Sequence, residues 1–258
     1  MFIPSLCGGL GNNMFQLSSI MSLSLEYGHE FGLENIPLPP SNHSNRDYTK
    51  SIFKNFNKYV GNYDIKNMII KKENSIGGVD RTDDLKNCNN IIKFEGYYQN
   101  EKNIRPFRNE IIKLFEINDE MNNEMNDYFL HIRRGDYVGN SYHELNLNNY
   151  YKKSLDLINN NKTGLTCNVL SNDIQWCEDY DLLKDYRVNF IKNSDEIYGL
   201  NIMKNSRLGG ISANSTYSWW GLYMNIERPY LIIPNRYFPH NMVHSEGYYF
   251  PECTIINI

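Results

Sequence analysis

Short apolar runs and helical patterns alternate through the second half of the chain, and this alternation restricts the fold more than any other feature. Five runs are predicted to be strands, at 128–132, 166–170, 187–191, 208–213 and 230–233. The helices predicted between them lie at 147–160, 174–183, 194–205 and 217–226. Repeated β-α units build a parallel, doubly wound sheet, so ligands are expected at the carboxyl ends of these strands.

One of these helices has a clear start signal. Ser194 is predicted to be the N-cap of the helix at 194–205, with Asp195 and Glu196 in its first turn. Acidic side chains at that end also favour a helix because they complement its dipole.

The first half opens in a similar way, with a strand at 2–6, a glycine turn at 8–11 and a helix that ends at Gly28. The predicted apolar face of this helix consists of Met14, Leu17, Met21 and Leu25. A further strand is predicted at 91–94 and a helix at 110–115, and the polar stretch 118–126 marks the boundary between two lobes. We therefore expect an α/β protein with two lobes, 1–125 and 126–258, that face each other across a cleft.

Charge and cysteine usage exclude several classes of protein. The 258 residues include 26 Lys and Arg against 30 Asp and Glu, a net charge of −4, so the positive field that nucleic-acid binding needs is absent. The five cysteines lie far apart without metal-site spacing, which is typical of reduced thiols in a cytoplasmic protein. No signal peptide and no run near ~18 apolar residues is visible, so we expect a soluble protein without a membrane segment.

The first candidate for chemistry is the glycine turn at 8–14, GGLGNNM, which leads into a helix. Free N–H groups at such a helix start suit an anion or a close approach of the backbone. The segment lacks the Lys-Ser/Thr of a P-loop and the order of a dinucleotide fingerprint. A simple tight turn is the alternative interpretation.

The second candidate is HIRRGDY at 131–137, which places Arg133 and Arg134 at the end of a strand. Strand alternation predicts that the two side chains point to opposite sides. One guanidinium could then bind a phosphate through two parallel N–H bonds while the other pairs with Asp136 or another carboxylate. A purely structural ion pair is the alternative.

Two more candidates also follow predicted strands. Asp173, in LSNDIQW at 170–176, either caps the next helix or accepts hydrogen bonds from a purine or ribose. The small hydroxylated residues at 212–218 resemble a phosphate cradle without lysine, and Trp219 and Trp220 after them suit either core packing or stacking.

The Asp-x-Asp pattern at 179–181 lies at the polar end of a predicted helix, so we interpret it as solvated surface and predict no metal site.

Taken together, these segments resemble the α-1,2-fucosyltransferase family, glycosyltransferase family 11. Its members carry a G-G-L-G-N-Q-M-F-Q type segment, G-Y-x-Q-x-E-K, H-x-R-R-G-D-Y-V, S-x-D-x-x-W-C and N-S-[ST]-x-S-W-W-G. The corresponding segments occur here in that order at 8–16, 96–102, 131–138, 171–177 and 214–221. Asn13 departs from the usual Gln and Asn172 from a frequent Asp, and the chain is short for the family.

The resemblance implies a GT-B-like fold of two Rossmann-like lobes, with the acceptor on the side of 1–125 and the donor nucleotide in 126–258. It also implies an inverting, metal-independent transfer of L-fucose from GDP-fucose, the donor substrate, to a glycan acceptor. The expected linkage is α-1,2, to O2 of a galactose, and no cofactor is expected. The family's motifs put Arg133 on the donor β-phosphate, with His131 and Arg134 shaping that pocket. The remaining donor-binding residues implied in this way are Gly11, Asn12, Asp173, Asn214, Ser215 and Thr216.

Transfer from a nucleotide diphosphate sugar requires relief of charge on the leaving group and a base for the acceptor hydroxyl. Arg133 could supply the first, and Asp136, His143 and Glu144 are the candidates for catalysis near it. Two other functions stay open: the same fold with another nucleotide-sugar donor, or a sugar- or nucleotide-binding protein without turnover. The sequence leaves the acceptor and the oligomeric state open.

Overall fold

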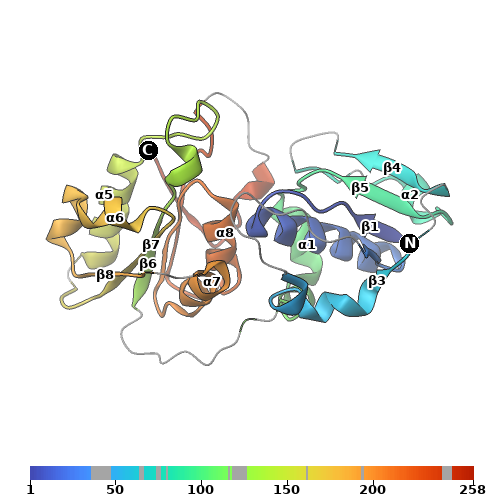
Figure 1. Ribbon diagram of the computed structural model, residues 1–258, viewed down its shortest axis with the longest axis horizontal. Coiled ribbons are helices and arrows are strands. Elements are labelled where there is room, and N and C mark those ends of the chain that lie inside the picture. The colour runs from blue at the N-terminus through green and yellow to red at the C-terminus, as the bar shows by residue number, and fades with distance from the viewer. Residues whose placement is uncertain are drawn as a thin grey trace. The chain divides into compact units, whose positions relative to one another are not determined.

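The computed structural model describes residues 1–35, 48–63, 67–73, 77–79, 81–115, 117, 127–160, 162–192, 195–239 and 246–258. The chain forms two compact units (Figure 1). One consists of Met1–Ile117 with Val243–Phe250, and the other of Asn118–Met242 with Pro251–Ile258. The boundary predicted within 118–126 lies outside the described residues.

The second unit contains a six-stranded parallel sheet in the order β11-β10-β9-β6-β7-β8. Its strands are β6 (Tyr128–Ile132), β7 (Cys167–Ser171), β8 (Val188–Phe190), β9 (Gly209–Ile211), β10 (Tyr230–Pro234) and β11 (Thr254–Ile256). The five strands predicted here are confirmed, while β11 is an addition. The strand order reverses between β6 and β9, which is the Rossmann-like arrangement whose ligands bind beside that point.

Helices cover both faces of this sheet (Figure 1). They are α5 (Asn148–Asn159), α6 (Ile174–Glu178), α7 (Glu196–Asn205) and α8 (Thr216–Tyr223). Leu130 and Ile132 of β6 pack in one core cluster with Leu155 of α5. His131 alternates with them and contacts Tyr217 of α8, so α8 lies on the other face. Trp219 and Trp220 are fully buried, which confirms the core interpretation.

Two sequence predictions about these helices are wrong in detail. The helix predicted at 174–183 ends at Glu178, because Tyr180 adopts an extended conformation, and a 3-10 helix follows, η6 (Asp181–Asp185). Asp195, not Ser194, is the N-cap of α7, and its side chain accepts a hydrogen bond from the Tyr198 N–H. An ionised carboxylate makes a stronger bond to that amide and complements the helix dipole.

A buried arginine, Arg228, joins the C-terminal ends of α7 and α8. Its guanidinium donates to the carbonyl oxygens of Met203, Lys204 and Ser206 at the end of α7. It also donates to the carbonyls of Gly221 and Leu222 at the end of α8, over 2.8 and 3.0 Å. Burial lowers the pKa of Arg228 to about 9, so the group stays charged at neutral pH. The Arg228 guanidinium therefore supplies hydrogen-bond donors to the last carbonyl groups of both helices, which have no partner within their own helix.

The first unit contains a smaller parallel sheet, in the order β1-β5-β4, and a long helix, α1 (Leu10–Tyr27). As predicted, this helix ends at Gly28, which has a left-handed conformation with a φ of 70°. Leu25, expected on its apolar face, is instead 45% exposed because it lies in the last turn. The strands are β1 (Phe2–Pro4), β2 (Leu33–Glu34), β3 (Val60–Gly61), β4 (Ile69–Lys72) and β5 (Ile92–Glu95).

The other elements of this unit are short. The helices are α2 (Asp83–Lys86), α3 (Glu101–Ile104) and α4 (Arg108–Ile112), and the 3-10 helices are η1 (Tyr48–Lys50), η2 (Lys54–Tyr59), η4 (Arg105–Phe107) and η7 (Glu246–Tyr248). The last of these comes from the far end of the chain. Its Tyr248 ring stacks on Phe15 of α1, with 6.0 Å between centroids. Gly247 packs closely on Asn100, because a Cβ added to Gly247 would lie 1.7 Å from the side-chain oxygen of Asn100.

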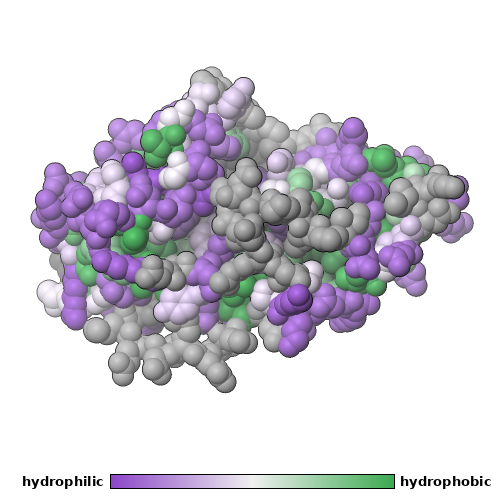
Figure 2. All heavy atoms as spheres, viewed as in Figure 1, coloured by the Kyte–Doolittle hydropathy of each residue, from purple (hydrophilic) through white to green (hydrophobic). Residues whose placement is uncertain are grey.

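The surface seen in Figure 2 is largely hydrophilic, with hydrophobic residues in small separate groups. All five cysteines lie in described segments, and each is a free thiol. Within the described segments, no helix has both the length and the apolar character needed to cross a bilayer.

Candidate functional site

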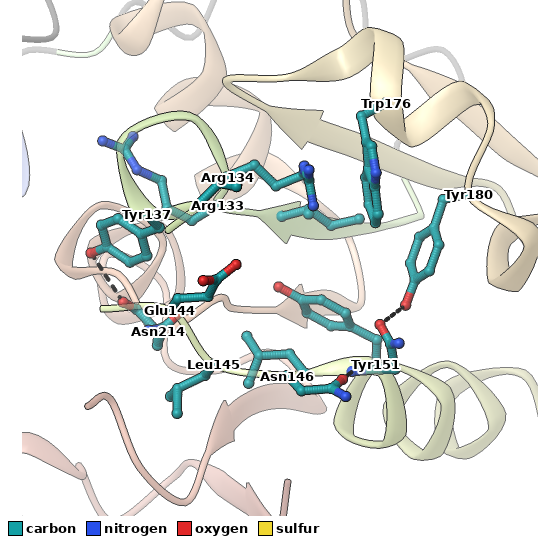
Figure 3. A pocket seen from close by; sticks show the side chains of 14 residues that line it. Arg133, Arg134, Tyr137, Glu144, Leu145, Asn146, Tyr151, Trp176, Tyr180 and Asn214 are labelled. Carbon is teal, nitrogen blue, oxygen red and sulfur yellow. Dashed lines mark hydrogen bonds between the residues drawn. The ribbon is translucent and has the colours of Figure 1, made fainter. Parts of the chain in front are cut away.

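A cavity of about 330 Å³ opens at the carboxyl ends of β6 and β7 in the second unit (Figure 3). Its lining comes from the loop after β6, the start of α5, the helix α6 and the segment after β9. The lining residues are Ile132, Arg133, Arg134, Tyr137, Val138, Glu144, Leu145, Asn146, Leu147, Asn148, Tyr151, Trp176, Tyr180 and Asn214. The cavity therefore lies at the sheet edge where the sequence predicts a ligand.

Arg133 and Arg134 both line this cavity, and Figure 3 shows their side chains turned apart, Arg133 toward Tyr137 and Arg134 toward Trp176. Strand alternation is not the cause of this divergence, because β6 ends at Ile132 and both arginines lie in the loop beyond it. Arg134 has φ −129° and ψ −112°, which is not a strand conformation. The loop continues into the 3-10 helix η5 (Gly135–Tyr137).

Arg133 is held by two neighbours in its own loop. Its Nη2 lies 2.7 Å from Oδ1 of Asp136, and its guanidinium carbon lies 5.3 Å from the centre of the Tyr137 ring. The Arg133 side chain is only 14% exposed, so its contacts with Asp136 and Tyr137 are partly shielded from water. An arginine oriented in this way needs little reorganisation to bind an oxyanion.

Arg134 pairs with Asp173, which is the alternative carboxylate that the sequence left open, whereas Asp136 pairs with Arg133. Nε of Arg134 lies 3.1 Å from Oδ2 of Asp173, and its guanidinium carbon lies 3.8 Å from the centre of the Trp176 ring. Asp173 is also the N-cap of α6, since Oδ1 accepts a hydrogen bond from the Trp176 N–H. Asp173 does not line the cavity, and both oxygens of its carboxylate already have partners, Arg134 and the Trp176 N–H.

The backbone of the arginine loop, residues 133–147 between β6 and α5, is held by Asn172. Its side-chain oxygen accepts a hydrogen bond of 2.9 Å from the Arg134 N–H. Gly135 next to it has a φ of +39°, and a Cβ there would lie 2.1 Å from the Asn172 side-chain nitrogen. The glycine of the Arg-Arg-Gly sequence is therefore needed for both conformation and space.

His131 lies beneath this loop and does not line the cavity. It is 3% exposed, and its ring meets that of Tyr217 edge-on, with 5.4 Å between centroids. Within the described part of the chain, its Nδ1 is a buried nitrogen without a hydrogen-bond partner. Burial, and to a smaller extent the charge of Arg133, lowers the pKa of His131 to about 3, so the ring is neutral at pH 7.

The low pKa of His131 predicts that the folded protein loses stability as the pH falls. In the unfolded chain the imidazole gains a proton near pH 6.5, whereas the folded protein resists this down to about pH 3. Stability is therefore full above pH 6.5 and falls by roughly 1.4 kcal/mol per pH unit below it. Between pH 7 and pH 5, urea unfolding should show that the native protein loses about 2 kcal/mol more than His131→Phe. Equal losses in the two proteins would contradict this assignment.

His143 lies away from the cavity lining and contacts aromatic rings. Its ring stacks on Tyr137, with 4.7 Å between centroids and 16° between planes, and lies 5.6 Å from the ring of Phe238. Burial lowers its pKa and Arg133 adds to this, while Asp136 opposes it.

Asn214 lines the cavity, but its amide group joins two segments of the chain. Its Nδ2 donates to the carbonyls of His143 and Tyr237 over 2.8 and 2.9 Å. Its own carbonyl accepts a hydrogen bond from the Tyr137 hydroxyl over 3.3 Å (Figure 3). Ser215 is the N-cap of α8, and Thr216 is the first residue of that helix.

Glu144 is the candidate base that lines the cavity, whereas Asp136 and His143 do not. Figure 3 shows its carboxylate turned toward the interior, on the side opposite Arg134. Its Oε2 accepts a hydrogen bond of 2.9 Å from the Gly139 N–H, which fixes the side chain. Aromatic residues form much of the remaining wall, including Tyr151, Trp176 and Tyr180, to which the sequence analysis assigned no role.

The glycine turn belongs to the first unit, where Gly11 and Asn12 lie in the first turn of α1. Asn12 accepts a hydrogen bond of 2.9 Å from the side chain of Gln99, which comes from another of the family-like segments. Gly8 has a φ of +77°, and a Cβ there would lie 2.5 Å from the Asn12 side-chain nitrogen. The turn is thus held by contacts within its own unit.

In the segments that the structure describes, no group of three or more His, Cys, Asp or Glu side chains is arranged to hold a metal ion. Asp179 and Asp181 are exposed, as expected, and Asp181 pairs with Lys184 over 2.6 Å.

The sequence model of Glycosyl transferase family 11 matches residues 1–257. The chain belongs to glycosyl transferase family 11. This confirms the resemblance seen in the five motifs, and the protein is a glycosyltransferase with a sugar donor and an acceptor as substrates.

Two curated relatives of this family 11 chain come from Escherichia coli. The chain is 28% identical over 287 residues to the O-antigen biosynthesis glycosyltransferase WbnK, which covers 92% of this chain and 94% of that protein. It is 29% identical over 171 residues to an alpha-1,2-colitosyltransferase, which covers 60% of this chain and 59% of that protein.

Proposed function

We propose that this glycosyltransferase moves L-fucose from GDP-fucose to O2 of a galactose in a glycan, with inversion, so that an α-1,2 linkage forms. The observation that carries the proposal is the pair Arg133 and Arg134 in one cavity at the carboxyl edge of a Rossmann-like sheet. The Arg133 guanidinium suits the charge of a nucleoside diphosphate, while Arg134 is paired with Asp173 and shapes the wall of the cavity.

The donor would bind with its diphosphate on Arg133 and its base along the aromatic wall. A guanidinium can hold two phosphate oxygens through parallel N–H bonds. The Trp176 ring already lies between Arg134 and Tyr180, so a purine would pack on the Tyr151 and Tyr180 side of the wall. Guanine and fucose come into the proposal from the family motifs. The GT-B arrangement, with Gly11 and Asn12 of the acceptor lobe near the transferred sugar, comes from the same source.

The residues of the cavity suggest a division of roles in transfer. As the glycosidic bond breaks, negative charge grows on the leaving diphosphate, and Arg133 would stabilise it without a metal ion. Glu144 would accept the proton of the acceptor hydroxyl, because its carboxylate faces the cavity. The proposed place of the reaction is the cytoplasm, where nucleotide sugars would be the donor pool.

A second candidate keeps the same site but uses another sugar on the nucleotide. One observation favours it: a relative at 29% identity is named for colitose rather than fucose. The departures at Asn13 and Asn172 are two positions at which donor preference could differ from that of other members.

Product analysis tests the proposal. The protein is incubated in EDTA with GDP-fucose and a panel of galactosides, and the products are examined by mass spectrometry and NMR. We expect GDP release and one α-1,2-fucosylated product, because guanidinium groups supply the charge relief. Activity that EDTA removes and Mn²⁺ restores would contradict metal independence.

Titration calorimetry with GDP, UDP and dTDP accompanies this assay. Tight binding of UDP or dTDP but not GDP would support another donor and overturn the proposal. Binding of GDP without turnover on any galactoside would support a non-catalytic binding protein.

A further inference from the structure

We propose that His143 is a positioning residue, whose ring holds Tyr137 against the Arg133 guanidinium and thereby fixes the donor-binding arginine. The inference rests on the proposed function, in which Arg133 binds the diphosphate. It gives His143 a role different from proton transfer.

The contacts run in one sequence from the cavity to the segment after β10. The Arg133 guanidinium carbon lies 5.3 Å from the Tyr137 ring, and that ring stacks on His143 at 4.7 Å. His143 in turn lies 5.6 Å from Phe238. We call Tyr137, His143 and Phe238 the aromatic row. Because a cation is attracted to the face of an aromatic ring, a support that fixes the ring also orients the cation.

The aromatic row is tied down by Asn214. The amide of Asn214 donates to the backbone carbonyls of His143 and Tyr237, so it joins the arginine loop to the segment that carries Phe238. The Tyr137 hydroxyl donates to the Asn214 carbonyl, which fixes the other end of the Tyr137 ring (Figure 3). The His143 ring and the Asn214 carbonyl, which lies in a separate segment, therefore determine where Tyr137 lies.

The chemistry of His143 suits support rather than catalysis. Its ring faces aromatic neighbours and does not line the cavity, where an acceptor hydroxyl would have to be reached. The charged groups that act on it are Arg133 and Asp136, and burial favours its neutral form. A neutral ring adds no positive charge that would repel Arg133.

Two substitutions at position 143 separate ring support from other effects. His143→Ala removes the ring that supports Tyr137, and we expect it to weaken GDP binding about tenfold and to raise KM for GDP-fucose. His143→Phe keeps an aromatic ring and should bind GDP as the native protein does. KM for the acceptor should stay unchanged in both. GDP affinity is measured by titration calorimetry, well below the melting temperature of each variant.

His29→Ala is a matched control, because His29 also contacts an aromatic ring, that of Phe2, but in the first unit. It should lower the melting temperature without changing GDP affinity. A purely structural role of His143 would give the same result for His143→Ala, and that outcome would overturn the inference.

Arg133→Ala distinguishes failure of this inference from failure of the proposed function. If Arg133→Ala abolishes GDP binding while His143→Ala leaves it intact, the positioning role is wrong and the donor site stands. If neither variant changes GDP affinity, the donor site itself is wrong. A loss in His143→Phe as large as in His143→Ala would also overturn the inference, because the imidazole rather than the ring would then matter.

Phe238→Leu supplies a second test in case His143→Ala does not fold. It removes the Phe238 ring from the aromatic row without changing any residue of the arginine loop. Weaker GDP binding in this variant supports the inference, and unchanged binding overturns it.

Discussion

Arg133→Ala should lower the rate of sugar transfer by about 100-fold or more while the protein stays folded. Charge-assisted hydrogen bonds contribute ~1.5–3 kcal/mol each, and each ~1.4 kcal/mol of lost transition-state stabilisation costs a factor of ten. A guanidinium that holds two oxygens of the leaving diphosphate acts most strongly as their charge grows. Little stability should be lost, since the partner carboxylate of Asp136 is 40% exposed and remains hydrated.

Arg133→Lys should restore little of this activity. The ammonium of lysine is a single point charge, so it cannot form two parallel bonds to phosphate or lie flat on the Tyr137 ring. Single-turnover rates with GDP-fucose and calorimetric titration with GDP measure both effects.

Arg134→Ala is the control for Arg133→Ala. It breaks the pair with Asp173 and the stacking on Trp176, so its main effect should be a lower melting temperature. Turnover close to that of the native protein in folded Arg133→Ala would remove the donor-site assignment.

Arg228→Met should destabilise the second unit by roughly 3–5 kcal/mol, a large part of the ~5–15 kcal/mol that stabilises a typical protein. The substitution keeps most of the apolar stem, so it isolates the guanidinium. Without that group, carbonyls at the ends of α7 and α8 stay buried without donors, and each such group costs about 1–3 kcal/mol. Urea unfolding followed by circular dichroism measures the difference.

Arg207→Ala provides the comparison for Arg228→Met. Arg207 pairs with Asp127 through a side chain that is 63% exposed, so its loss should cost less than about 1 kcal/mol. Equal unfolding midpoints for Arg228→Met and Arg207→Ala would show that the buried guanidinium contributes no more than a surface ion pair.

The sheet of the second unit could be predicted because its central strands are buried on both faces. Every residue of Tyr128–Ile132 is buried, and the run is short and apolar apart from His131, which distinguishes it from the helical patterns beside it. The edge strand Thr254–Ile256 was not predicted. It is three residues long and mostly exposed, so burial imposes no apolar pattern on its sequence.

The site could be predicted in its residues but not in its pairings. Arg133 and Arg134 are recognisable because two adjacent cations at a strand end call for negative partners. Which carboxylate each one meets depends on how the loops after β6 and β7 pack, and local sequence does not contain that information. The contact between His143 and Phe238 depends on packing in the same way, since the two residues lie far apart in the chain.

The placement of Val243–Phe250 in the first unit has a consequence for the order in which the protein can fold during synthesis. Tyr248 stacks on Phe15 of α1, and Gly247 packs on Asn100, so the interior of the first unit includes residues that are translated after the strands β6 to β10 of the second unit. The N-terminal part of the nascent chain must wait for these residues until they leave the ribosome. For the same reason, a fragment that stops near residue 125 would lack part of its own interior, and neither unit can be expressed whole as one uninterrupted piece of the gene.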